Sequence, residues 1–222
     1  TGELLKEKII ETAHELTRQM KENLDIVNGN IVRTTDGEIL MSLGELATEK
    51  LYSLTNNGHL TAESSYQIKN NAYSFGCTFV EVEVDIPGCK AQVTDILNVH
   101  DCGRLINPAL AEAQVHGGMS MAIGYALSEK MLYDERTGKP LNNNLLDYKL
   151  STFMDHPDLH AAFIENYEPT SAYGTKALGE PPTCSPAPAI RNAILQATGV
   201  ALNEIPMRPH LLFEKFTEAG LL

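Results

Sequence analysis

The chain contains two kinds of hydrophobic periodicity, one helical and one of strand type. From Leu4 to about Met20, apolar residues recur at helical spacing and leave charged residues on the other side, which predicts an amphipathic packing helix. From Phe79 to Ile86, apolar and acidic residues alternate, which is typical of a strand with one buried face. Pro87-Gly88 turns this strand, and Ala91 to Val99 returns as a second one. The pattern therefore predicts an antiparallel hairpin with a solvated acidic face.

Capping and turn signals predict the remaining elements. Ser42 and Glu45 have the spacing of a capping box, which indicates a short helix through about Leu51. Longer helices are expected at about 109–130 and from 186 or 187 to 198, with a short helix at 209–216 and a strand at 161–165. Helices alternating with mainly antiparallel strand pairs predict an α+β fold, with a possible sub-division into 1–74 and 75–222.

Composition and charge exclude several classes of partner. The chain has 222 residues, 17 of them Lys or Arg, and a formal net charge of -12, which argues against binding to nucleic acid or to an anionic membrane surface. No apolar run has membrane-spanning length, and no signal peptide opens the sequence. The four cysteines form no C-x-x-C pair, so we expect reduced thiols and a cytoplasmic location. Because the chain begins at Thr1 without an initiator Met, a fragment, a processed subunit or a trimmed chain is expected.

The strongest candidate for chemistry is the stretch from Ala172 to Pro182. Gly174 and Gly179 allow close approach of the backbone, and two prolines follow Glu180 directly. Since a residue before Pro is disfavoured in the helical region, we expect Glu180 to lie on a stiff, non-helical turn. A fixed carboxylate suits a general base, although many such strings are surface turns with a solvated acid.

A second candidate lies where the predicted strand runs into the next helix. Gly103 permits a tight turn there, and backbone amides at a helix entry favour a phosphate. Asn107 is equally suited to ordinary capping, so the spacing alone leaves both roles open. In the helix itself, Gly117 and Gly118 each cost about 1 kcal/mol relative to Ala, which favours close approach of another backbone or a ligand.

Three blocks stand in a fixed order along the chain: Gln114 to Gly118, Ala172 to Pro182, and Ala187 to Ile194. In order and spacing they resemble the molybdopterin-binding subunit of the xanthine dehydrogenase family of molybdenum hydroxylases. The resemblance extends along essentially the whole chain and is closest to the bacterial xanthine dehydrogenases. It implies that the 222 residues are the C-terminal portion of a molybdenum cofactor-binding domain.

The resemblance also implies roles for individual residues. Glu180 matches the general base of the family, and Gln114 matches a glutamine that hydrogen-bonds the molybdenum cofactor. The cofactor edge is expected to lie against two short segments, whose members are Gly103, Arg104, Asn107, Lys176, Ala177, Leu178 and Gly179. No residue of this chain is expected to bind the metal directly.

The implied reaction is oxidative hydroxylation, by water, of a purine such as xanthine or hypoxanthine. The molybdenum-molybdopterin cofactor would be shared with the upstream part of the subunit. This chain has no G-x-G-x-x-G string and no cluster-binding pattern, so the sequence gives no support for a flavin or iron–sulfur site within it. The resemblance implies that FAD and iron–sulfur clusters lie on other domains or subunits. A homo-oligomer of the complex is expected. A related hydroxylase for an aldehyde, nicotinate or another N-heterocycle, and a noncatalytic assembly or dimerisation module, are the alternatives.

Overall fold

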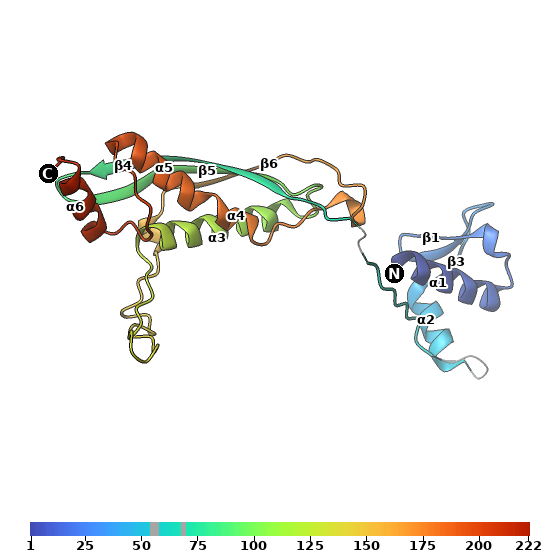
Figure 1. Ribbon diagram of the computed structural model, residues 1–222. Helices are drawn as coiled ribbons and strands as arrows, with labels where there is room; N and C mark the ends of the chain where they lie inside the picture. The colour runs from blue at the N-terminus through green and yellow to red at the C-terminus, as the bar shows by residue number, and fades with distance from the viewer. Residues whose placement is uncertain (54–57, 68–69) are drawn as a thin grey trace. The chain divides into compact units, whose positions relative to one another are not determined.

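The computed structural model describes residues 1–53, 58–67 and 70–222. The chain divides into two compact units, Thr1–Gln67 and Ile68–Leu222, and each has its own buried cluster (Figure 1). No helix in the described ranges is both long enough and apolar enough to cross a membrane. The four cysteines are free thiols.

The first unit packs two helices against a small antiparallel sheet. Its elements are α1 (Gly2–Thr17), β1 (Leu24–Val27), β2 (Asn30–Arg33), β3 (Ile39–Ser42) and α2 (Leu43–Tyr52), with a 3₁₀ turn at Lys21–Asn23. The predicted capping box is confirmed, because Ser42 Oγ accepts from the Glu45 N–H at 3.1 Å and Glu45 accepts from the Ser42 N–H at 2.8 Å. The first helix ends earlier than predicted, at Thr17, because Arg18 adopts a left-handed conformation with φ of 57°.

The second unit is built on the predicted hairpin. β4 (Phe75–Asp85) and β5 (Lys90–Asp101) pair antiparallel along their lengths, and the acidic residues of β4 are exposed. β6 (Leu159–Phe163) is the strand that the sequence placed at 161–165, and it joins β5 in parallel. Parallel pairing requires the long connection between the two strands, which contains α3 (Pro108–Leu127). The α+β prediction is confirmed.

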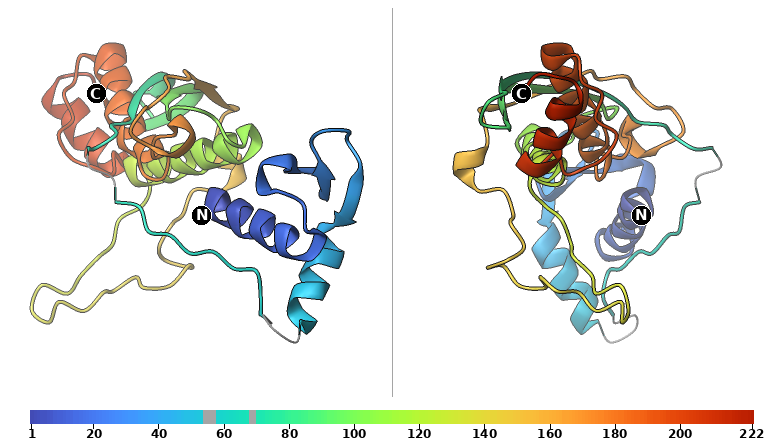
Figure 2. Two further views of the ribbon diagram at one scale, coloured as in Figure 1. Left: turned by 90° about the vertical axis from the view of Figure 1, so that its right-hand side faces the viewer. Right: turned by 60° about the vertical axis from the view of Figure 1, so that its left-hand side comes forward.

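The helices of the second unit bury a common core beneath this sheet. α3 and α5 (Pro186–Thr198) pack against the strands and against each other, and α6 (Pro209–Glu218) closes one end of the cluster (Figures 1 and 2). α5 ends at Gly199, whose φ of 76° is the left-handed cap that the sequence predicted. α3 stops at Leu127 rather than at 130, because the Ser128 and Glu129 N–H groups both turn back to the Gly124 carbonyl.

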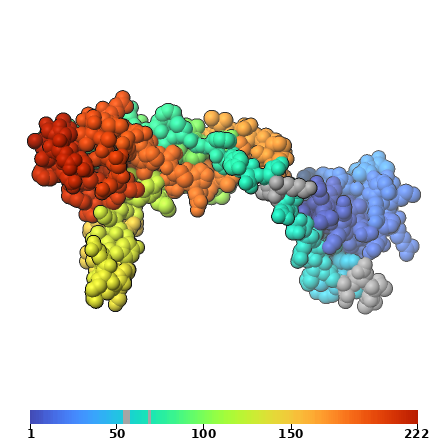
Figure 3. Space-filling view, viewed as in Figure 1, coloured from blue at the N-terminus to red at the C-terminus, as the bar shows by residue number. Residues whose placement is uncertain are grey.

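A long excursion leaves the unit between α3 and β6. We call residues 129–155 the arm, which includes the 3₁₀ turn Phe153–Asp155. The arm stands out from the surface of the unit, where it is drawn in yellow (Figures 1 and 3). Two further short helical segments lie in the stretch with the strongest sequence signal, the 3₁₀ turn Ala172–Gly174 and α4 (Pro181–Cys184).

Candidate functional site

Two of the sequence-predicted segments lie side by side at one end of α3. Gly103, directly after β5, forms a β-bridge with Thr175, and the Arg104 N–H donates to the Gly174 carbonyl at 2.9 Å. Gly103 has a φ of 67°, and a Cβ atom there would lie 2.3 Å from the Gly174 oxygen. Only glycine fits this position, which agrees with the tight turn that the sequence predicted at Gly103.

Lys176 makes a buried ion pair below this bridge. Its Nζ lies 2.7 Å from Asp101 Oδ2, and the two side chains are only 4% and 12% exposed. Burial acts to raise the pKa of Asp101, but hydrogen bonds from Lys176, the Gly103 N–H and Asn166 outweigh it and hold the pKa below its usual value. The Lys176 ammonium also lies 5.6 Å from the centre of the Phe75 ring. The buried ion pair with Asp101 therefore fixes the position of Lys176 in the loop.

The loop from Lys176 to Glu180 is held by one side chain from α3 and one from the residue before β4. Gln114 Nε2, on α3, donates to the Gly179 carbonyl at 2.7 Å, and Ser74 Oγ donates to the Ala177 carbonyl. Because a trans peptide is planar, its N–H points away from its carbonyl. The following N–H groups, those of Leu178 and Glu180, therefore point away from Gln114 and Ser74. They have no acceptor among the described residues.

Asn107 and Arg104 lie at the entry of α3. Asn107 is the N-cap, since its Oδ1 accepts from the Leu110 N–H at 3.1 Å, and Pro108 occupies the first helical position. Arg104 is exposed beside it. The sequence left capping and ligand binding open for Asn107, and the structure contains the cap.

Glu180 is exposed and immediately precedes α4. Its φ of -88° and ψ of -27° are helical, so the prediction that the prolines push it out of the helical region is wrong. The conformation is stabilised because the Glu180 carbonyl accepts from the Thr183 N–H at 2.9 Å and from Thr183 Oγ1 at 2.8 Å, which closes the turn. Pro181 opens α4, and its ring fixes the helical φ there.

The turn that carries Glu180 is clamped from the sheet and from α3. Pro182 lies against Gly118, where a Cβ atom would come within 2.5 Å of the Pro182 Cβ. The wholly buried Asn98, on β5, donates from Nδ2 to the Pro182 carbonyl at 3.1 Å. The Tyr125 hydroxyl, on α3, donates to the Thr183 carbonyl. Three contacts thus fix the backbone within three residues of Glu180.

Asn98 and Tyr125 were missed from the sequence. Asn98 lies at an inward position of an otherwise alternating strand, next to the buried Ile96 and His100. A buried polar residue must find a hydrogen-bond partner. A polar residue at an inward position also breaks the alternation of the strand, and this break was the signal in the sequence that could have identified Asn98. Tyr125 gave no signal, because an aromatic residue in an apolar helix is ordinary core.

The arrangement suits an anionic pterin cofactor. Gln114, Asn107, Arg104 and the exposed part of the loop offer hydrogen-bond donors and one guanidinium around the entry of α3, whose N-terminus favours negative charge. Gly179 leaves open space, with nothing within 4 Å of an added Cβ atom. These donors fit a phosphate and a ring edge.

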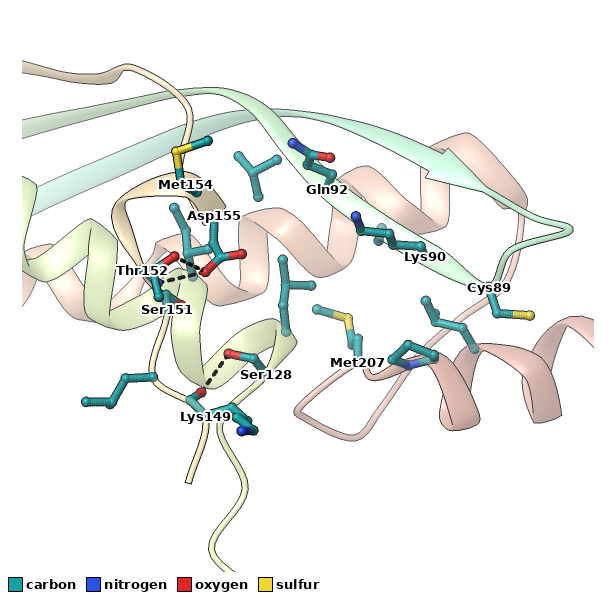
Figure 4. Close-up of a pocket in the computed structure, with 17 residues that line it drawn as sticks. Cys89, Lys90, Gln92, Ser128, Lys149, Ser151, Thr152, Met154, Asp155 and Met207 are labelled. Carbon is teal, nitrogen blue, oxygen red and sulfur yellow. Dashed lines mark hydrogen bonds between the residues drawn. The ribbon is translucent and has the colours of Figure 1, made fainter. Parts of the chain in front are cut away.

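A separate cavity of about 470 Å³ lies toward the other end of α3 (Figure 4). Ile123 and Leu127 line it, and at 1.5 Å per residue Leu127 lies about 20 Å along the helix from Gln114. None of the predicted site residues lines this cavity. Among the described residues, no three His, Cys, Asp or Glu side chains are grouped as a metal site.

Comparison with known proteins identifies the family to which this chain belongs. The family model of the molybdopterin cofactor-binding domain matches residues 1–157, so the chain belongs to that family. The resemblance proposed from the sequence is confirmed.

Particular relatives refine this result. The chain is 51% identical over 220 residues to the putative xanthine dehydrogenase molybdenum-binding subunit XdhA of Escherichia coli K12, covering 99% of this chain and 29% of that protein. Its fold resembles a Cu,Mo-CO dehydrogenase, with a TM-score of 0.81 and 25% identity over 99% of this chain and 28% of that one. The fold also resembles quinoline 2-oxidoreductase from Pseudomonas putida 86, with a TM-score of 0.81 and 26% identity. That match covers 97% of this chain and 28% of the other. The chain thus spans under a third of the length of these relatives.

Proposed function

We propose that this chain is the part of a molybdenum hydroxylase that carries the general base, Glu180. The proposed reaction is the oxidative hydroxylation of a purine, such as xanthine or hypoxanthine, by water. The observation that carries the proposal is the clamped turn of Glu180 beside the Gln114–Gly179 hydrogen bond, which places a carboxylate next to open hydrogen-bond donors. The 51% identity to a putative xanthine dehydrogenase subunit supports the purine.

The proposed chemistry requires a base at a fixed position. Hydroxylation adds the oxygen of water to a ring carbon next to nitrogen and releases two electrons and two protons. When bound, the molybdenum cofactor supplies the acceptor for both electrons. Glu180 takes one proton at a carboxylate oxygen from the water-derived nucleophile, and general-base catalysis of this kind contributes about 10²- to 10⁴-fold. Asn98 and Gly118, through their contacts with Pro182, fix the backbone that carries this carboxylate.

The cofactor-binding residues in this proposal are those at the entry of α3 and in the adjoining loop. Arg104 and Gln114 contribute side chains, while Ala177, Leu178 and Gly179 contribute backbone. Gly103, Asn107 and Lys176 shape these segments through contacts with other residues of the chain. The rest of the site is proposed to lie on the upstream part of the subunit. FAD and iron–sulfur clusters would lie on further domains or subunits of a homo-oligomeric complex, located in the cytoplasm.

A second candidate function is hydroxylation of a different N-heterocycle or of an aldehyde. The similarity of fold to quinoline 2-oxidoreductase supports this alternative. A noncatalytic assembly module is the third candidate. The carboxylate of Glu180, exposed beside open donors, favours an enzyme over such a module.

The test compares Glu180→Gln with wild type in the complete enzyme, in which this chain is present together with the rest of the molybdenum-binding subunit. Molybdenum and pterin content are measured together with dye reduction by xanthine, hypoxanthine, quinoline and benzaldehyde. We expect turnover to fall about 10²-fold or more with cofactor content unchanged. Glu204→Gln, at another exposed Glu, is the matched control and should keep full activity. Substantial activity in Glu180→Gln overturns the assignment of the base, and the best substrate decides between the first two candidates.

A further inference from the structure

Three polar side chains form a chain of hydrogen bonds between the β4–β5 hairpin and α4. Thr78 and Asn98 lie directly opposite each other on β4 and β5. Thr78 Oγ1 donates to Asn98 Oδ1 at 3.1 Å, and it also lies 2.6 Å from Ser185 Oγ. Asn98 Nδ2 donates to the Pro182 carbonyl at 3.1 Å. We call Thr78, Asn98 and Ser185 the polar cluster, which holds α4 at its second residue and at the residue after its end.

The direction of each hydrogen bond in the polar cluster follows from the groups that form it. The Pro182 carbonyl can only accept, so the NH₂ side of the Asn98 amide must face it. The amide oxygen is then left for Thr78, whose single hydroxyl hydrogen is used in that bond. Ser185 Oγ must therefore donate to Thr78 Oγ1. Because the bonds depend on one another in this way, the loss of one side chain disturbs the rest of the cluster.

Pro186 explains why the Pro182 carbonyl needs a side-chain donor. In a continuous helix, the carbonyl of each residue accepts from the N–H four residues further on. For Pro182 that residue is Pro186, and proline has no N–H. Since Pro182 is buried, its carbonyl requires another partner. The wholly buried Asn98 supplies the donor that the sequence of the helix withholds.

The polar cluster acts on the backbone that carries Glu180. Only Pro181 separates Glu180 from Pro182, and Pro181 is the first residue of α4. Thr183, the residue after Pro182, donates to the Glu180 carbonyl from its N–H at 2.9 Å and from Oγ1 at 2.8 Å. A rotation or shift of α4 would therefore move the Glu180 backbone with it. The cluster opposes such a movement from the side of the sheet.

We propose that Thr78, Asn98 and Ser185 are positioning residues that act on Glu180 through α4. Their loss should leave cofactor and substrate bound and should slow proton transfer to the Glu180 carboxylate, because a displacement of about 1 Å can cost about 10²-fold in rate. The effect should therefore appear in kcat per molybdenum and not in KM. This inference rests on the proposed role of Glu180.

The test uses variants of the complete enzyme and whichever of xanthine, hypoxanthine, quinoline and benzaldehyde the wild type oxidises fastest. Asn98→Leu removes both amide bonds and should lower kcat per molybdenum about tenfold or more, with KM unchanged. Thr78→Val keeps the shape of the side chain but lacks the hydroxyl, and it should also lower kcat, as should Ser185→Ala. Thr78→Ser restores the hydroxyl and should recover most of the kcat lost in Thr78→Val.

A stability control and a double variant separate positioning from a general loss of structure. Leu212→Ala removes a wholly buried side chain of α6, so it should lower the melting temperature and leave kcat per molybdenum unchanged. If Asn98 acts through Glu180, adding Asn98→Leu to Glu180→Gln should lower kcat little further, because residues that act as a unit are not additive.

Two results would overturn the inference. One is a wild-type kcat per molybdenum in Asn98→Leu, and the other is a loss in the double variant as large as the product of the two single losses. If Asn98→Leu does not fold, the Thr78 pair decides, since equal kcat in Thr78→Val and Thr78→Ser would refute the cluster. The proposed function fails differently, because Glu180→Gln alone would then keep substantial activity.

Discussion

Gln114 donates a hydrogen bond of 2.7 Å to the carbonyl of Gly179, and so joins the middle of α3 to the residue directly before Glu180. The glutamine side chain thereby orients the peptide whose N–H belongs to Glu180 itself. One amide thus connects the proposed cofactor site with the proposed base.

Replacing Gln114 with Leu should affect function more than stability. The bond is exposed, so its loss should cost only about 0.5–1.5 kcal/mol of unfolding free energy. We expect molybdenum content and kcat of the complete enzyme both to fall at least tenfold, because the loop loses its support and the cofactor a donor. Thermal melting and metal analysis measure the two effects. Gln196→Leu, on the exposed side of α5, is the control, and equal losses in both variants would contradict the role.

Gly118 and Gly117 should respond oppositely to alanine. In Gly118→Ala the new Cβ meets Pro182 at 2.5 Å, so overpacking should cost about 1–3 kcal/mol and displace the Glu180 turn. In Gly117→Ala the space is open, so the chain by itself should gain up to about 1 kcal/mol from helix propensity. Urea denaturation of the two variants gives the comparison. A destabilised Gly117→Ala chain would show that the space is filled within this chain.

The ion pair between Lys176 and Asp101 should be strongly coupled. Because both side chains are almost buried, removing either partner leaves an unpaired charge and should cost about 3–5 kcal/mol. Replacing both, as Lys176→Met/Asp101→Leu, should recover much of this loss. A double-mutant cycle in urea measures the coupling, and additive single effects would contradict it. Lys215→Met, at an exposed ion pair, should change stability by less than about 1 kcal/mol.

The elements that were predicted correctly are those whose signals lie in neighbouring residues of the sequence. The hairpin at β4 and β5, the capping box at Ser42 and the end of α5 at Gly199 were predicted because alternation, capping and left-handed turns are local properties. The parallel pairing of β6 with β5 was not predicted, since strand direction depends on the path of a long connection.

In the candidate site, too, local features were easier to predict than contacts between distant residues. The family resemblance predicts roles for Gln114 and Glu180, and these roles stay predictions. The sequence could not tell that Lys176 turns inward to Asp101, because that contact joins residues 75 positions apart. The helical conformation of Glu180 was mispredicted, since a local rule for the residue before Pro was outweighed by two hydrogen bonds from Thr183. Local rules thus predict which residue types are present in the candidate site, whereas tertiary contacts determine the conformation and partners of each side chain.

His100 should make the protein less stable as the pH falls below about 6.5. It is 1% exposed, and burial lowers the pKa of its ring despite an opposing effect of the Phe75 backbone. Neither ring nitrogen has a hydrogen bond of normal geometry in the described part of the chain. The unfolded chain therefore takes up the proton first, at its ordinary pKa of 6.5. Stability is fully present above that pH and is lost as the pH falls toward the lowered folded value.

His100→Leu should remove this pH dependence because leucine cannot be protonated. Melting temperatures at pH 7.5 and 5.5 should differ clearly for wild type and much less for the variant. Asp101 does not interfere, since its pKa is held below the usual 3.8 and its pairing is lost only in stronger acid. His160→Leu, at an exposed histidine of β6, should retain the wild-type slope. An unchanged slope in His100→Leu would mean that another group, and not the buried ring, takes up the proton on unfolding.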